Sequence, residues 1–117
     1  MDERSADIEA DYHLLLSEEE LPLTARALRL LISDEAHQPQ IRGFAREVLV
    51  ELEAAGEQRG ERIHSIALTA PQMKITHSAL RGLLNDLQHE QAEEMHLLQQ
   101  ILEKLPDEHA IRAIVLE

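Results

Sequence analysis

The sequence predicts a mainly α-helical single domain of 117 residues, made of two helical-hairpin repeats with pseudo-twofold symmetry and two or three very short strands. Three observations support this fold class. Apolar residues recur at helical spacing over long stretches. Two of these stretches follow a helix-capping signal. The pattern T-x-x-A-L-R-x-L-x-x-D-x-x-H also occurs twice.

The internal repeat is the most informative feature of the chain. The pattern occupies residues 24–37 and again residues 76–89, an offset of 52 positions. Because a shared pattern at a constant offset is the mark of a duplicated structural unit, we expect two equivalent hairpins. Repeat one is expected to span about residues 12–56, and repeat two about residues 64–109.

Three segments have the composition of very short strands. Apolar residues alternate with other residues at 12–16 and at 63–68, as in a half-buried strand. The segment 111–116 is apolar and rich in residues that favour strands. It could form a third strand, or the tail 110–117 could act as a docking arm on another subunit. Residues 1–10 are acidic and weakly patterned, so we expect them to be disordered.

Two capping boxes mark the expected helix starts. Ser17 precedes Glu20 by three residues, and Thr69 precedes Gln72 by the same distance. In this motif the hydroxyl accepts a hydrogen bond from a first-turn N–H, and the residue three positions on reaches back to the cap. A helix is therefore expected directly after each of the first two strands.

The first hairpin is expected to contain helices at about residues 18–34 and 40–55. Pro39 prevents a single continuous helix, and Gly56 with Gly60 marks the joint between the repeats. Apolar residues at helical spacing are expected to face the core. They are Leu21, Ala25, Leu28, Leu31, Ile32, Ile41, Phe44, Ala45, Val48, Leu49 and Leu52.

The second hairpin leaves two interpretations open. No proline or glycine occurs between Leu83 and Leu105, so one helix could span residues 70–104. Gln91 and Glu94 interrupt the apolar stripe, which would suit a break equivalent to the turn of the first hairpin. A continuous helix would extend beyond a domain of this size and would require a partner chain.

Composition excludes several classes of function. The chain has no cysteine, which excludes disulfides, thiolate zinc sites and cysteine nucleophiles. The N-terminal segment has no apolar run, and no stretch approaches the roughly 20 apolar residues that a membrane span needs. We therefore expect a cytoplasmic protein that does not bind membranes.

The formal charge of −12 is concentrated at the two ends of the chain. Residues 1–20 carry a net −7, residues 21–85 carry +1, and residues 86–117 carry −6. Such a surface repels phosphate backbones, so direct binding of nucleic acid is not expected. It would instead suit a basic protein partner. One alternative function is therefore an acidic nucleic-acid mimic that inhibits a DNA-binding protein.

Four polar residues at helical spacing raise the question of a metal site. Asp86, His89, Glu93 and His96 share one helix face, and Glu93-x-x-His96 has the spacing used by ferritin-like di-iron helices. However, this face is opposite the leucines, whereas di-iron ligands point into a helix-bundle core. We therefore predict no metal site and no cofactor, and keep a ferritin-like metal-binding protein as a second alternative.

The sequence contains no arrangement that marks a catalytic site. No hydroxyl stands at a motif spacing from a histidine, and the abundant acids occupy expected surface positions. We predict a non-enzymatic helical module for protein–protein interaction or regulation, acting as a homo-oligomer and most simply as a dimer. A broad apolar band predicts its interface. The interface residues are Leu97, Leu98, Ile101, Leu102, Leu105, Ile114 and Leu116.

Overall fold

The computed structural model confirms a mainly helical chain with a short two-stranded antiparallel sheet. It describes residues 12–34, 36–57, 62–87, 91–105 and 108–114. The predicted disorder of residues 1–10 and the position of Leu116 lie outside these ranges. The elements are β1 (Tyr12–Ser17), α2 (Glu20–Ser33), α3 (Pro39–Gly56), β2 (Ile63–Leu68), α4 (Ala70–Asp86), α5 (Ala92–Glu103) and α6 (Glu108–Ala113).

The two strands lie at the positions that the alternating pattern predicts. They pair in antiparallel register, with Leu14 opposite Ile66 at the middle of the ladder and Leu16 opposite His64. Side chains on one face of the pair are buried, and those on the other face are mostly exposed. This is the arrangement expected when alternating residues serve a core on one side only.

The prediction of a third strand at 111–116 is wrong. The chain there belongs to α6 as far as Ala113. Ile111 is buried against the core, and the Lys74 ammonium group donates a hydrogen bond of 2.7 Å to the carbonyl oxygen of Ile114. Strand propensity is weak compared with burial in tertiary structure, and packing on α4 decides the local conformation. The described part of the tail therefore folds onto its own chain.

Both predicted capping boxes are formed. Ser17 N–H donates to the Glu20 carboxylate at 2.9 Å, and Glu20 N–H donates to the Ser17 hydroxyl at 3.2 Å. The corresponding distances between Thr69 and Gln72 are 3.0 and 3.3 Å. In the first box, a turn at residues 18–19 separates the strand from the regular helix, whereas α4 starts directly after its cap. These bonds satisfy N–H groups that have no partner within the helix.

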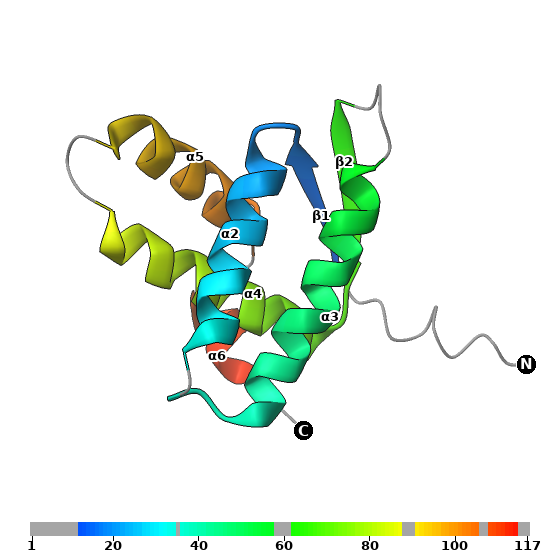
Figure 1. Cartoon of the computed structure of the whole chain (residues 1–117), viewed down its shortest axis with the longest axis vertical. Helices are drawn as coiled ribbons and strands as arrows, with labels where there is room; N and C mark the ends of the chain where they lie inside the picture. Colours follow the sequence, from blue (N-terminus) through cyan, green and yellow to red (C-terminus); the bar gives the residue numbers. More distant parts are fainter. Residues whose placement is uncertain (1–11, 35, 58–61, 88–90, 106–107, 115–117) are drawn as a thin grey trace, which may run out of the picture.

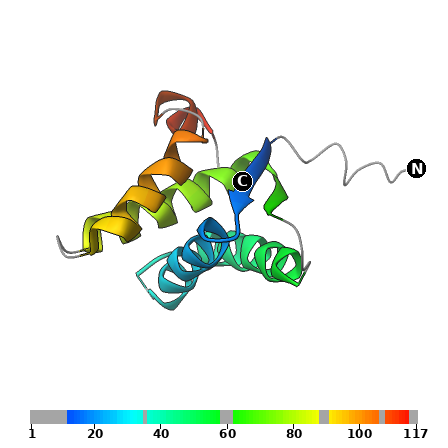
Figure 2. The ribbon, with the colours of Figure 1, turned by 90° about the horizontal axis from the view of Figure 1, so that it is seen from above.

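The second hairpin is broken, not continuous. Helix α4 ends at Asp86, and α5 begins at Ala92 and runs back beside it (Figure 1). The reversal lets α5 contact both α4 and α2, so that Leu98 and Ile101 become fully buried. Burial of these side chains offsets the loss of helix continuity. Figure 2 shows α4 and α5 side by side and α2 with α3 as a second helix pair, and α2 and α3 both pack directly against α4.

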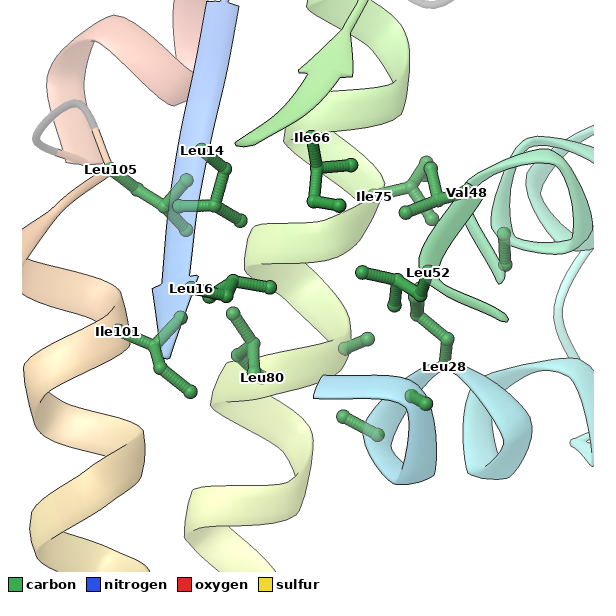
Figure 3. Packing of buried hydrophobic residues seen from close by; sticks show 14 of the residues in the cluster. Leu14, Leu16, Leu28, Val48, Leu52, Ile66, Ile75, Leu80, Ile101 and Leu105 are labelled. Atoms are coloured by element: carbon green, nitrogen blue, oxygen red, sulfur yellow. The ribbon is translucent and has the colours of Figure 1, made fainter. Parts of the chain in front are cut away.

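The core is aliphatic and lies between the strands and the helices (Figure 3). Leu14 and Leu16 extend from β1 toward side chains of α4 and α5, while α3 adds Val48 and Leu52 from the other side. Helix α2 is central, because it packs against α3, α4 and α5. Of the core positions expected in the first hairpin, four are partly buried and the rest are buried. The partly buried residues are Ile32, Ile41, Phe44 and Leu49.

No helix in the described ranges is both long enough and apolar enough to cross a membrane.

Candidate interaction surfaces

The predicted interface in the second hairpin is largely part of the protein's own core. Leu98 and Ile101 are fully buried, and Leu105 is almost so. Leu97, Leu102 and Ile114 are partly buried and pack against the core. Two thin and separate hairpins would leave these side chains exposed, but α5 folds against α2 and covers them. Leu98 and Ile101 therefore contribute to the packing of the chain itself, whereas Leu97, Leu102 and Ile114 remain partly exposed.

The polar face that suggested metal ligands is divided by the helix break. Asp86 ends α4, whereas Glu93 and His96 are exposed on α5. His89 lies outside the described residues. Within the described chain, no three histidine, aspartate or glutamate side chains come together as potential metal ligands. The imidazole of His96 instead lies 3.2 Å from the side-chain amide of Gln100.

The outward face of the two strands is a candidate interaction surface, which we call the strand face. It consists of His13, Leu15, Ser17, Ile63, Ser65 and Ala67. Leu15 and Ile63 each keep 50% of their surface exposed. None of the six side chains is a carboxylate, although the chain contains 23 acids. Large apolar side chains on an uncharged surface are typical of a contact site.

The sequence does contain a signal for the strand face. The inward set Leu14 and Leu16 was recognised from its alternation, but Leu15 stands between them, and Ile63 is likewise out of phase with Ile66. An apolar residue in the outward phase of a strand is exposed when only one face of the sheet is covered.

One edge of the strand face is held by a lysine at the end of α5. The Lys104 ammonium group donates to the carbonyl oxygen of Leu15 at 2.8 Å and is also hydrogen-bonded to the Glu20 carboxylate. The Glu20 side chain is 5% exposed, whereas that of Lys104 is 36% exposed. This ion pair joins β1, the start of α2 and the end of α5, so it determines where α5 lies relative to the strands.

A second candidate surface is a groove of about 340 Å³ between the C-terminal halves of α2 and α4, which we call the inter-helix groove. Its inner wall is apolar, and its outer part carries polar groups. The apolar residues are Ala27, Leu30, Leu31, Ala79, Gly82 and Leu83. The polar residues are Asp34, His37, Ser78, Asn85 and Asp86.

The electrostatics of the inter-helix groove are unusual, because two aspartates stand at helix C-termini. Asp34 is the C-cap of α2, and Asp86 is the last residue of α4. Neither helix has a basic residue in its last turn. The carbonyl end of a helix carries partial negative charge, and an acid there typically costs about 0.3–1 kcal/mol. The groove therefore combines two carboxylates with two negative helix ends.

Asp34 has partners among the described residues, whereas Asp86 has none there. An oxygen of Asp34 accepts a hydrogen bond of 3.0 Å from the Ala36 N–H, and its other oxygen lies 3.7 Å from the His37 imidazole. Asp86 makes no hydrogen bond or ion pair with any residue that the structure describes. Within the described ranges, no side chain therefore balances the Asp86 carboxylate of the groove.

A third hollow, of about 400 Å³, lies beside α4 and α6. Lys74, His77 and Arg81 line it together with Ile111. The Lys74 ammonium group is bound to the carbonyl oxygen of Ile114, so part of this positive charge already serves to hold α6. Lys74 at this hollow therefore has a structural role in addition to any binding role.

Comparisons of the chain with protein-family models, with curated proteins and with solved structures found no significant match. Any functional proposal therefore depends on these surfaces and their chemistry.

Proposed function

We propose that this protein is a non-enzymatic interaction module that forms a homodimer through its strand face. The observation that carries the proposal is the exposure of Leu15 and Ile63 on a strand pair whose outer side is covered by none of the described helices or strands. The proposal keeps the predicted class of function but moves the interface from α5 to the strands.

The distribution of charge favours a second copy as the occupant of the strand face. Two copies of a chain with a charge of −12 repel each other wherever their carboxylates approach. Helices α3, α4 and α5 each expose at least one carboxylate, for example Glu53, Asp86 and Glu93. None of the six side chains of the strand face is a carboxylate, although Glu51 of α3 lines a hollow together with Ile63 and Ser65, so two copies would meet there with less repulsion than on the helix surfaces.

The geometry of the strand face also suits a like surface. Two sheets pack face to face about 10 Å apart when their side chains interlock. Leu15 lies opposite Ser65, and Ile63 lies opposite Ser17, so each large side chain has a small neighbour across the ladder. This alternation of large and small side chains allows an identical face to interdigitate with it.

The size of the apolar contact predicts a dimer of modest affinity. Burying the exposed half of Leu15 or Ile63 is worth about 1 kcal/mol per side chain. A dimer would bury both residues from each copy, for about 4 kcal/mol, which only matches the low end of the cost of association, so the remaining contacts of the strand face must supply the net affinity. We therefore expect a dimer that dissociates on dilution.

Sedimentation velocity over a series of protein concentrations tests this proposal. The wild-type chain should shift from monomer to dimer as the concentration rises, whereas Leu15→Lys and Ile63→Lys should remain monomeric with unchanged circular dichroism. Val50→Lys is the matched control, because Val50 is 62% exposed on α3 and lies outside the strand face. A wild-type chain that stays monomeric throughout, or a Val50→Lys variant that dissociates equally, would refute the proposed interface.

We also propose that the two hairpins are equivalent units related by a pseudo-twofold axis through the strand pair. Leu14 and Ile66, which differ by 52 positions, face each other at the middle of the ladder. The hydroxyls of Thr24 and Thr76 are both buried, and each donates a 2.9 Å hydrogen bond to the carbonyl four residues earlier. These correspondences support a duplicated strand and first helix.

The second helices of the hairpins correspond at a different offset. Burial pairs Val48 with Ile101 and Ala45 with Leu98, which are 53 positions apart. An alignment at 52 would place the partly buried Leu49 over the fully buried Ile101. The proposed duplication therefore includes one extra residue between α4 and α5. An experimental structure tests this, because residues 12–33 should superimpose on 64–85 under a rotation near 180° that also brings α3 onto α5.

A further inference from the structure

We propose that the inter-helix groove between α2 and α4 binds a lysine or arginine side chain from a basic protein segment. The proposal concerns a surface separate from the strand face and does not depend on dimerisation. It rests on three features of the groove, namely an apolar wall, an unbalanced negative rim and space left by a glycine.

The apolar wall matches the stem of a long cationic side chain. Ala27, Leu31, Ala79 and Leu83 are buried residues that line the groove, and Leu30 remains 47% exposed at its side. Lysine and arginine carry three or four methylene groups before their charged end, and they commonly lay this stem along apolar surface. The exposed part of Leu30 would then be covered by the stem.

The negative rim matches the charged end of the same side chain. Asp34 and Asp86 line one groove, and the C-terminal ends of α2 and α4 reinforce their charge. Placing acids where helices favour bases lowers the stability of the free protein, and such local conflicts tend to occur at functional sites. A cation bound between the two aspartates would relieve both unfavourable interactions.

A protein side chain fits the groove better than a metal ion does. The described residues bring together no three potential metal ligands, and much of the lining is hydrocarbon. The overall charge of −12 would also draw a basic segment toward the protein before contact is made. An acidic or phosphorylated partner would experience the opposite force.

Gly82 keeps the groove open. A Cβ atom built at this position would meet nothing within 4 Å, so the site is empty space and not a close backbone contact. The residue 52 positions earlier is Leu30, whose side chain stands on the opposite side of the groove. Replacing Gly82 by leucine would therefore fill the proposed stem site without disturbing the packing of α2 against α4.

The test is an NMR titration of isotope-labelled protein with the peptide acetyl-Gly-Leu-Arg-Leu-Gly-amide. Saturable shifts should centre on the backbone amides of residues 27–34 and 79–86. The same peptide with citrulline in place of arginine has nearly the same shape and no charge, and it should bind about fivefold more weakly, the effect expected for losing ion pairs to two partly exposed carboxylates.

Two variants separate the roles of charge and space. The double variant Asp34→Asn with Asp86→Asn should weaken peptide binding about fivefold, and asparagine keeps the acceptor for the Ala36 N–H. Glu93→Gln with Glu103→Gln is the matched control, since it makes the same change in net charge on the exposed side of α5 and should change binding less than twofold. Gly82→Leu should abolish the shifts at residues 79–86 while the helical signal in circular dichroism is retained.

Several results would overturn the proposal. These are the absence of saturable shifts, equal binding of the citrulline peptide, and equal weakening by the control pair. The groove would be assigned to a metal instead if manganese or calcium ions alone produced saturable perturbations at the same amides and displaced the peptide. Every one of these measurements reports on the backbone amides of the groove. A negative result here is therefore distinguishable from a failure of the strand-face dimer, which sedimentation velocity measures.

Discussion

Replacing Lys104 with methionine is expected to destabilise the fold by about 2 kcal/mol. In the native protein the Lys104 ammonium group binds the Glu20 carboxylate and the carbonyl oxygen of Leu15. Methionine has a similar length and no charge, so it preserves much of the packing. The variant therefore isolates the loss of the ion pair at a carboxylate that is 5% exposed.

The magnitude follows from the burial of the two partners. Removing one partner of a fully buried ion pair typically costs about 3–5 kcal/mol, because the other charge is left without compensation. Here the Lys104 side chain is 36% exposed, so water can reach the site once the ammonium group is gone, and the cost should be roughly halved. Glu20 would keep the hydrogen bond from the Ser17 N–H, which also limits the loss.

Urea unfolding followed by circular dichroism measures this effect through a double-mutant cycle. Glu20→Gln is the matched change, because Gln72 at the same position of the second capping box makes the equivalent hydrogen bond with its neutral amide. The double variant Glu20→Gln with Lys104→Met should be more stable than Lys104→Met alone, since it no longer buries an unpaired charge. Equal stability of Lys104→Met and the wild type would show that the pair does not hold α5 against the strands.

Three further predictions concern single positions. Leu98→Ala should lower the free energy of unfolding in urea by about 3 kcal/mol, because the Leu98 side chain is fully buried. Leu98→Asp should abolish the cooperative unfolding transition, since it buries a charge. A Leu98→Asp variant as stable as the wild type would place α5 outside the core. Gly82→Ala and Gly43→Ala should each raise the free energy of unfolding by about 0.5–1 kcal/mol, since neither new methyl group meets an atom within 4 Å. A loss of stability in either variant would contradict the open space at that position. His96→Ala should change thermal stability by less than about 0.5 kcal/mol, because the side chain is exposed and its hydrogen bond in the described chain is with Gln100. Metal that elemental analysis detects in the wild type and not in this variant would disprove the prediction that His96 is no metal ligand.

The sequence predicted the local structure correctly where interactions between residues close in the chain determine it. The capping box of Thr69 and Gln72 specifies a helix start, because both of its hydrogen bonds join residues three positions apart. The alternation in the two strands and the helical period of α2 and α3 were equally clear, since they depend on which side chains share one face of an element. The break between α4 and α5 stayed open, because a polar interruption of an apolar stripe is compatible with a straight helix or a turn.

The surfaces required the tertiary structure. Leu98 and Leu15 are both leucines next to apolar neighbours, yet one is fully buried and the other is half exposed. The first is covered because α5 returns toward α2, and the second is exposed because no helix or strand in the described ranges covers the outer side of the strand pair. Similarly, the sequence alone gives Asp34 and Asp86 as ordinary polar positions. The packing of α2 against α4 places both of them at one groove.

By itself, the sequence determined the helical class, the two strand segments, the capped helix starts and the excess of negative charge, because these follow from composition and from contacts within a few residues. The tertiary structure alone decided that α5 belongs to the core, that residues 111–113 are helical, and that none of the described elements covers the strand face or the inter-helix groove. The physical reason is that burial depends on which elements meet across the fold, and this is decided by the summed packing of distant side chains.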